Sequence, residues 1–230
     1  RIDRSLGTIH SPKDAHGYGI GMVYQHFTSV PAMTVAENLV LSRYDTQQQI
    51  NWKKENETLR AFIAQSPFQI DLDSPVAELA AGQKQKLEIL KQLYLKSKIL
   101  ILDEPTSVLT PAEADEDLGL LREEVVKKNL SILLITHKFR EVRAFADDVT
   151  ILRKGKLAGQ GKVAQLSVEE MAQMMLGKSK DSTSVTITPT EQKIAVLSIK
   201  DIHAKGENGL PAVNGIDLTV HAGEIVGIAG

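Results

Sequence analysis

Two short apolar runs on either side of a helix-forming stretch constrain the fold of this 230-residue chain most strongly. Residues 99–102 and 132–135 contain only isoleucine and leucine, a pattern typical of strands buried on both faces of a parallel sheet. Between them, residues 110–113 (Thr-Pro-Ala-Glu) combine an N-cap, a proline at the first helical position and a capping-box glutamate. The sequence therefore predicts a right-handed β-α-β crossover, with a helix that runs to about Lys128.

The chain upstream of this crossover has a helical pattern. A short buried strand is expected over residues 19–24, and residues 28–96 are expected to be mostly helical. A capping box at 34–37 opens one helix, and Asn51 can cap a second that runs to about Gln65. A third helix, with leucines at helical spacing, is expected after Gly82.

Downstream of the crossover, the pattern predicts a hairpin around residues 149–158 and a helix that begins after Ser167 and closes at Gly177. A stretch rich in Ser, Thr and Lys then reads as a linker, and three β-prone runs follow it. We therefore divide the chain into a first domain, a linker and the start of a second domain, with boundaries at 1–177, 178–194 and 195–230.

Composition excludes several classes of function. Lys and Arg number 27 against 29 Asp and Glu, for a net charge of −2, whereas nucleic-acid binding usually leaves a basic excess. There is no cysteine, which rules out disulfides, zinc–thiolate sites and thiol catalysis. No apolar run approaches the ~18 residues of a membrane span, so we expect any membrane role to act through a partner. The chain starts at Arg1 without a signal-peptide pattern, and we expect both ends to be internal to a longer protein.

The strongest chemical signal lies at the carboxyl ends of the two predicted strands. Asp103 and Glu104 follow the first strand directly, and His137 follows the second. Neighbouring parallel strands end at one edge, which is where open α/β sheets bind ligands. Phosphoryl transfer uses one carboxylate to hold Mg²⁺ and another group to orient the attacking water. An ordinary polar turn is the alternative for Asp103 and Glu104 taken alone.

Two further segments are weaker signals by themselves. Residues 79–83 (Leu-Ala-Ala-Gly-Gln) precede the third helix, and a glycine there leaves backbone N–H groups free for a phosphate. A plain glycine N-cap is the simpler reading of Gly82. Gln25 follows the strand at 19–24 and is uninformative alone.

Taken in order, these segments resemble the motifs of ATP-binding cassette (ABC) ATPases. Gln25 is similar to the Q-loop, residues 99–104 to Walker B and His137 to the switch histidine. The signature motif corresponds to Leu79, Ala80, Ala81, Gly82 and Gln83, and the D-loop to Thr106, Ser107, Val108, Leu109 and Thr110. The resemblance covers residues 10–177 and, as the opening of a second cassette, 195–230. Within the family, the chain resembles the two-cassette ATPases of bacterial simple-sugar and nucleoside importers.

The resemblance implies an α/β fold of the P-loop NTPase type, with a mostly parallel sheet, an inserted helical subdomain at about 28–96 and the β-rich start of a second cassette. It implies ATP and Mg²⁺ as cofactors, with Mg²⁺ held through Asp103 and Gln25. Glu104 would be the general base for the attacking water, and His137 would contact the γ-phosphate.

The same resemblance implies partners and a location. Integral membrane permease subunits would carry the solute, a nucleoside or simple sugar, and a solute-binding protein would act indirectly. A second cassette in the same chain would complete the ATPase. The protein would lie peripherally on the cytoplasmic face of the inner membrane, without nucleic acid as a partner.

The chain departs from the family pattern at several positions. Ala80 stands where the signature usually has Ser, Ala81 where it usually has Gly, and Thr110 where the D-loop usually has Asp. No G-x-x-x-x-G-K-[ST] sequence is present, so we expect one P-loop upstream of Arg1 and another beginning at Gly230. This chain alone is then expected to be inactive.

Two other classes remain as alternatives. A non-transport cassette ATPase of the DNA-repair or ribosome-associated type is one, although repair members carry zinc-binding cysteines and ribosome-associated members a long basic arm. The other is a non-catalytic regulatory or structural fragment. The presence of Asp103, Glu104 and His137 argues against it.

Overall fold

The computed structural model describes residues 8–43, 49–127, 129–177, 194–206, 209 and 211–228. The chain divides into two compact units, Arg1–Ser179 and Lys180–Gly230, and each is described by itself. Apart from Ile194, the predicted linker at 178–194 lies outside the described residues.

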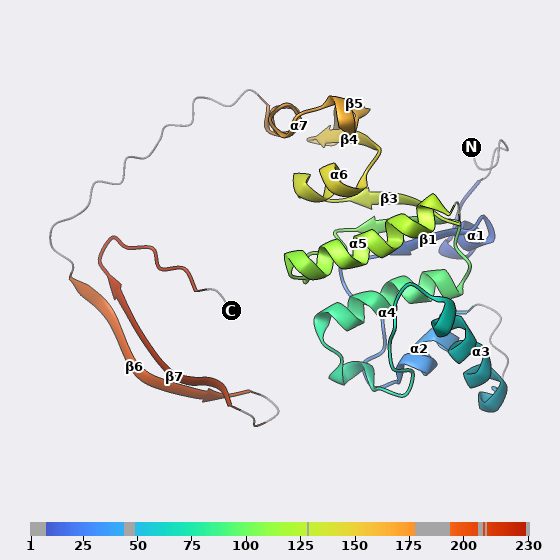
Figure 1. Ribbon diagram of the computed structural model, residues 1–230, viewed down its shortest axis with the longest axis horizontal. Coiled ribbons are helices and arrows are strands. Elements are labelled where there is room, and N and C mark those ends of the chain that lie inside the picture. The colour runs from blue at the N-terminus through green and yellow to red at the C-terminus, as the bar shows by residue number, and fades with distance from the viewer. Residues whose placement is uncertain are drawn as a thin grey trace. The chain divides into compact units, whose positions relative to one another are not determined.

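A parallel three-stranded sheet forms the centre of the first unit (Figure 1). Its strands are β1 (Ile20–Val23), β2 (Ile99–Asp103) and β3 (Ser131–Ile135), in that order across the sheet. Val23 of β1 pairs with Leu102, and Asp103 pairs with Ile135 of β3. All three strands therefore end at the same edge, which the sequence predicted for β2 and β3.

Helix α5 (Pro111–Val126) makes the crossover between β2 and β3. Thr110 and Glu113 form the predicted capping box, and Pro111 occupies the first helical turn. The helix ends at Val126, two residues before the expected position. Leu121 of α5 packs into the same buried cluster as Leu100 and Leu102.

The described residues bury one face of this sheet and only partly cover the other, which corrects the expectation of burial on both faces. Leu100 and Leu102 are fully buried, whereas Leu133 and Ile135 of β3 are 55% and 44% exposed. The apolar runs predicted the two strands correctly, but no described element covers the second face of the sheet over β3.

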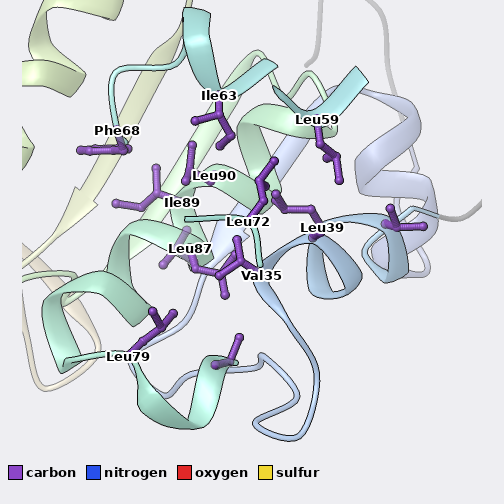
Figure 2. Close-up of a cluster of buried hydrophobic side chains, with 14 of the residues drawn as sticks. Val35, Leu39, Leu59, Ile63, Phe68, Leu72, Leu79, Leu87, Ile89 and Leu90 are labelled. Carbon is purple, nitrogen blue, oxygen red and sulfur yellow. The ribbon is translucent and has the colours of Figure 1, made fainter. Parts of the chain in front are cut away.

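The predicted helical region contains α2 (Val35–Leu41), α3 (Trp52–Gln65), the 3₁₀ helix η1 (Val76–Glu78) and α4 (Ala81–Tyr94). The capping box at Thr34 and the Asn51 cap are both present. Figure 2 shows apolar side chains from these helices and from the connection between α3 and η1 converging on one core, among them Val35, Leu39, Leu59, Ile63, Phe68, Leu72, Leu87 and Leu90.

A buried ion pair ties the segment after β1 to the middle of α4. Glu88 Oε1 accepts the backbone N–H groups of Thr28 and Ser29 at 2.9 and 2.8 Å, and its Oε2 accepts the Thr28 hydroxyl at 2.7 Å. Lys91 Nζ lies 2.7 Å from Glu88 Oε2 and donates to the Thr28 hydroxyl at 2.8 Å. Both charged side chains are buried, so this cluster fixes residues 28 and 29 on the helix.

The remaining elements of the first unit are α1 (Pro12–Gly17), α6 (Phe139–Phe145), the antiparallel pair β4 (Asp148–Arg153) and β5 (Lys156–Lys162), η2 (Val163–Gln165) and α7 (Val168–Leu176). The hairpin and α7 were predicted, and Ser167 caps α7 as expected. The short helices α1 and α6 were not predicted, because neither is long enough to show a clear apolar period.

In the second unit, the described residues form an antiparallel hairpin of β6 (Ala195–Lys205) and β7 (Pro211–His221). The third β-prone run, from Glu224, forms no strand over residues 224–228, and Ile225 is 98% exposed. A buried parallel-type strand requires neighbours on the sheet, and the described residues provide none for this run.

None of the helices within the described ranges combines the length and apolar character that crossing a bilayer requires.

Asp117 provides a pH-dependent test of the contact between α4 and α5. Its carboxylate is buried, and Lys86 Nζ lies 3.3 Å from Oδ1, yet neither oxygen has a hydrogen-bond partner among the described residues. Burial raises the pKa of Asp117 above 3.8, against the opposing effect of Lys86. The folded state thus binds this proton more tightly than the unfolded state, and the associated stability is lost as pH rises through the raised pKa.

We expect Asp117→Asn to increase the free energy of unfolding at about pH 7, and to change it little at about pH 4. Urea denaturation at both pH values measures the difference. A variant less stable than the wild type at neutral pH would instead show that the Lys86 pair outweighs the burial of the charge.

A second prediction concerns the Glu88–Lys91 pair. Glu88→Gln leaves the Lys91 ammonium buried without its counter-charge, so we expect a loss of about 3 kcal/mol in the free energy of unfolding. The exposed Arg122–Asp147 pair is the matched control, and Arg122→Gln should cost no more than about 1 kcal/mol. Equal losses in the two variants would contradict the structural role of the buried pair.

Candidate functional site

The candidate site lies at the carboxyl edge of the parallel sheet. Gln25 lies two residues beyond the end of β1, Glu104 one residue beyond β2 and His137 two residues beyond β3. The register that aligns these strand ends brings together three side chains separated by up to 112 positions in the sequence. The strand pattern predicted that Glu104 and His137 share this edge, whereas Gln25 was identified only through the resemblance to the family's Q-loop.

Glu104 makes direct contacts with the other two side chains. Gln25 Nε2 donates to Glu104 Oε2 at 3.4 Å, and His137 Nδ1 lies 2.9 Å from Glu104 Oε1. The Glu104 side chain is 29% exposed and that of His137 62%. A carboxylate held between an amide and an imidazole, and still open to solvent, can accept a proton from a bound water molecule.

The backbone of Glu104 adopts a left-handed conformation, with φ of 45°. This is uncommon for a residue with a side chain, and such backbone strain concentrates at functional sites. The Glu104 N–H donates to the Ile135 carbonyl at 2.9 Å across the strand end. The conformation therefore turns the chain sharply from β2 into Pro105 while keeping Glu104 linked to β3.

Asp103 is the last residue of β2, and its side chain is half-buried. Its carboxylate and the Gln25 amide oxygen are the hard ligands that Mg²⁺ prefers. No group of three or more His, Cys, Asp or Glu in the described ranges could hold a metal unaided. With Asp103 and Gln25 as its protein ligands, a Mg²⁺ ion would take its remaining ligands from water and phosphate oxygens, as this ion commonly does.

The segment 79–83 begins α4, and its start differs from the expectation. The N-cap is Ala80 and the helix begins at Ala81, so Gly82 lies inside the first turn. Gln83 Oε1 accepts the Ala80 N–H at 3.2 Å, which lets the helix begin earlier. Ala80, Ala81 and Gln83 are exposed, while Leu79 is buried in the helical core.

The predicted D-loop packs against this helix start. A Cβ placed on Gly82 would lie 3.3 Å from Leu109 Cδ2 and 3.4 Å from the Glu113 carboxylate, so the small residue allows the close approach. Ser107 and Val108 are exposed. Thr110, which stands where the family usually has Asp, caps α5 by accepting the Glu113 N–H at 3.3 Å, a role that Thr and Asp share.

The structure does not bring every predicted segment to one point. Within the described ranges, no hydrogen bond or ion pair joins residues 79–83 to Gln25, Glu104 or His137. A cavity of about 410 Å³ lies beside α1, β1 and α2, and neither Gln25, Asp103, Glu104 nor His137 lines it. The strand-end residues form an open edge.

Sequence reasoning missed a set of residues behind this edge. Thr136, Lys138 and Glu141 form a hydrogen-bonded group with Thr106. Each is an ordinary polar residue in sequence, and Glu141 lies on α6, which the pattern did not predict. Their signal is the burial of the Glu141 carboxylate, which only the structure reveals.

Comparisons with known proteins agree with this fold. Residues 4–107 match the family described as ABC transporter. The chain is 39% identical over 230 residues to the nucleoside import ATP-binding protein NupA of Lactococcus lactis, covering all of this chain and 45% of that protein. It is 39% identical over 228 residues to the guanosine import ATP-binding protein NupO of Bacillus subtilis, covering 96% of this chain and 43% of that protein.

The fold also matches solved structures. CbiO1 of Clostridium perfringens, described as part of an ABC transporter complex, aligns with a TM-score of 0.56 and 24% identity. The match covers 67% of this chain and 62% of that one. The chain spans less than half the length of the curated relatives that it matches. Residues 4–107 thus match the ABC transporter family, and the first unit has the fold of ATP-binding cassettes.

Proposed function

We propose that the full-length protein is the ATP-hydrolysing subunit of an ABC importer for a nucleoside or a simple sugar. The observation that carries this proposal is Glu104, held between Gln25 at 3.4 Å and His137 at 2.9 Å on the carboxyl edge of the sheet. The names of the relatives, which import nucleoside, guanosine, glucose and ribose, support the importer class and the range of solutes.

In this proposal each strand-end residue has one task. Asp103 and Gln25 would hold the Mg²⁺ ion that accompanies ATP, and that ion would supply neutralising charge to the phosphates. Glu104 accepts a proton from the attacking water, and His137 orients Glu104 and contacts the terminal phosphate. The open edge leaves room for the nucleotide, because Glu104 and His137 both retain solvent exposure.

The partners and location follow from the importer class. Permease subunits in the membrane would carry the solute that a solute-binding protein delivers, and the cassettes would lie on the cytoplasmic face. The first domain, residues 1–177, would act as one cassette, with residues 28–96 as its helical subdomain. Residues 195–230 would begin a second cassette, joined through the linker at 178–194.

The direct test of the proposed chemistry is Glu104→Gln in the full-length protein. A positioned general base contributes about 10²–10⁴ in rate, so we expect ATP turnover to fall by at least about 10² while nucleotide binding is retained. Glu123→Gln, which changes an exposed carboxylate of α5, is the control. Retention of half the wild-type turnover would show that a second, equivalent site hydrolyses ATP without Glu104.

A further prediction concerns the unusual residue at the start of α4. Ala80 is an N-cap without a side-chain hydrogen bond, so Ala80→Ser should add a cap and stabilise the protein by about 1 kcal/mol. In the family's pairing of cassettes, this segment would face the nucleotide of the other half, where Ala80 offers no hydroxyl to the phosphate.

We therefore expect that second site to be degenerate and Ala80→Ser to leave turnover nearly unchanged. Thermal unfolding and steady-state ATPase assays measure the two effects. A severalfold gain in turnover would instead indicate that the Ala80 site limits the cycle.

A further inference from the structure

A buried carboxylate bridges the segments that carry Glu104 and His137. Glu141 Oε1 accepts the Thr106 hydroxyl at 2.5 Å, and Glu141 Oε2 accepts the Thr136 hydroxyl at 2.9 Å. Thr106 lies two residues after Glu104, and Thr136 lies directly before His137. One side chain of α6 thus holds the turns that leave β2 and β3.

Lys138 completes the hydrogen bonding of this bridge. Its Nζ donates to the Thr106 carbonyl at 2.9 Å and to the Thr106 hydroxyl at 3.0 Å, and it lies 3.4 Å from Glu141 Oε1. The Lys138 backbone N–H donates to the Thr136 hydroxyl at 3.1 Å. Each threonine hydroxyl therefore donates to Glu141 and accepts from Lys138, which makes the two roles mutually consistent.

Because Glu141 is buried, its carboxylate depends on the hydrogen bonds of this network. The Glu141 side chain is 1% exposed, and a buried carboxylate is costly unless it is paired and hydrogen-bonded. Loss of one donor would leave an oxygen unsatisfied in a low-dielectric environment, where the penalty is larger than at the surface. The two turns are consequently held in one relative position, and that position is where Glu104 Oε1 meets His137 Nδ1.

We propose that Glu141 is a positioning residue for the Glu104–His137 pair, acting through the hydroxyls of Thr106 and Thr136. Glu141 is buried behind the edge, and no hydrogen bond in the described ranges joins it to Glu104 or His137. Its effect is on the separation of the two turns. This inference rests on the proposed function only for its catalytic consequence, since the bridge itself is a feature of the fold.

Thr136→Val tests the bridge without removing a charge, because valine keeps the shape of threonine and lacks its hydroxyl. In the full-length protein we expect Thr136→Val and Glu141→Gln each to lower kcat about tenfold or more, as small misplacements of catalytic groups do, with KM for ATP unchanged within about twofold. Thr136→Ser, which restores the donor, should recover most of the turnover that valine loses.

The double variant Thr136→Val with Glu141→Gln should be little worse than either single variant, because both interrupt one network. Arg140→Gln is the control on the same helix, since its pair with Asp115 is exposed. If Glu141→Gln fails to fold, Thr136→Val and Thr136→Ser alone test whether the bridge positions Glu104 and His137.

A second readout needs no nucleotide. The imidazole ¹⁵N chemical shifts of His137 report the proton on Nδ1 that faces Glu104. We expect the shifts of Thr136→Val to move toward those of Glu104→Ala, in which the acceptor is missing. Wild-type shifts and wild-type kcat in Thr136→Val would overturn the proposal. If the wild-type protein has no ATPase activity, the proposed function is contradicted. The NMR measurement then tests the Glu141 bridge independently of that function.

Discussion

The parallel register of β1, β2 and β3 is the constraint on which the rest of the site depends. Val23 aligns with Leu102, and Asp103 aligns with Ile135, so three polar residues distant in sequence leave the sheet at one edge. The register itself is fixed by burial, since a one-residue slip of β2 would expose Leu100 and Leu102, which are fully buried. The core that stabilises the fold therefore also sets the geometry of the site.

Two buried carboxylates then fix the chain on either side of this edge. Glu88 holds residues 28 and 29, just after Gln25, on α4, and Glu141 holds the turns next to Glu104 and His137. In contrast, Glu104 itself retains partial solvent exposure. Buried, hydrogen-bonded carboxylates thus hold the backbone in place beside this edge, while the reactive carboxylate of Glu104 stays accessible to solvent.

The sequence could predict the crossover, because residues 99–102 and 132–135 are purely apolar and residues 110–113 carry three helix-start signals together. It could also predict that Glu104 and His137 share an edge, since this follows from parallel pairing alone. The second face of the sheet could not be predicted, because Leu133 and Ile135 have the composition of buried residues although the described residues leave them exposed.

Other features required three-dimensional information for local reasons. Gly82 suggested an N-cap, but Gln83 bonds back to the Ala80 N–H and moves the helix start. Glu141 lies on a seven-residue helix that shows too little periodicity to be predicted, and its role depends on two threonines that are close only in space. The run after Glu224 has strand propensity, but the described part of the chain provides no neighbouring strand for it, so propensity alone was misleading there.

The central claim is that Gln25, Asp103, Glu104 and His137 act together on one Mg²⁺–nucleotide. The most direct measurement is an experimental structure of the full-length protein with Mg²⁺ and ATP bound, using Glu104→Gln to prevent turnover. The account predicts the metal beside Gln25 and Asp103, with residue 104 and His137 facing the terminal phosphate. A nucleotide whose phosphates lie away from this edge, with these four side chains directed to solvent, would contradict it.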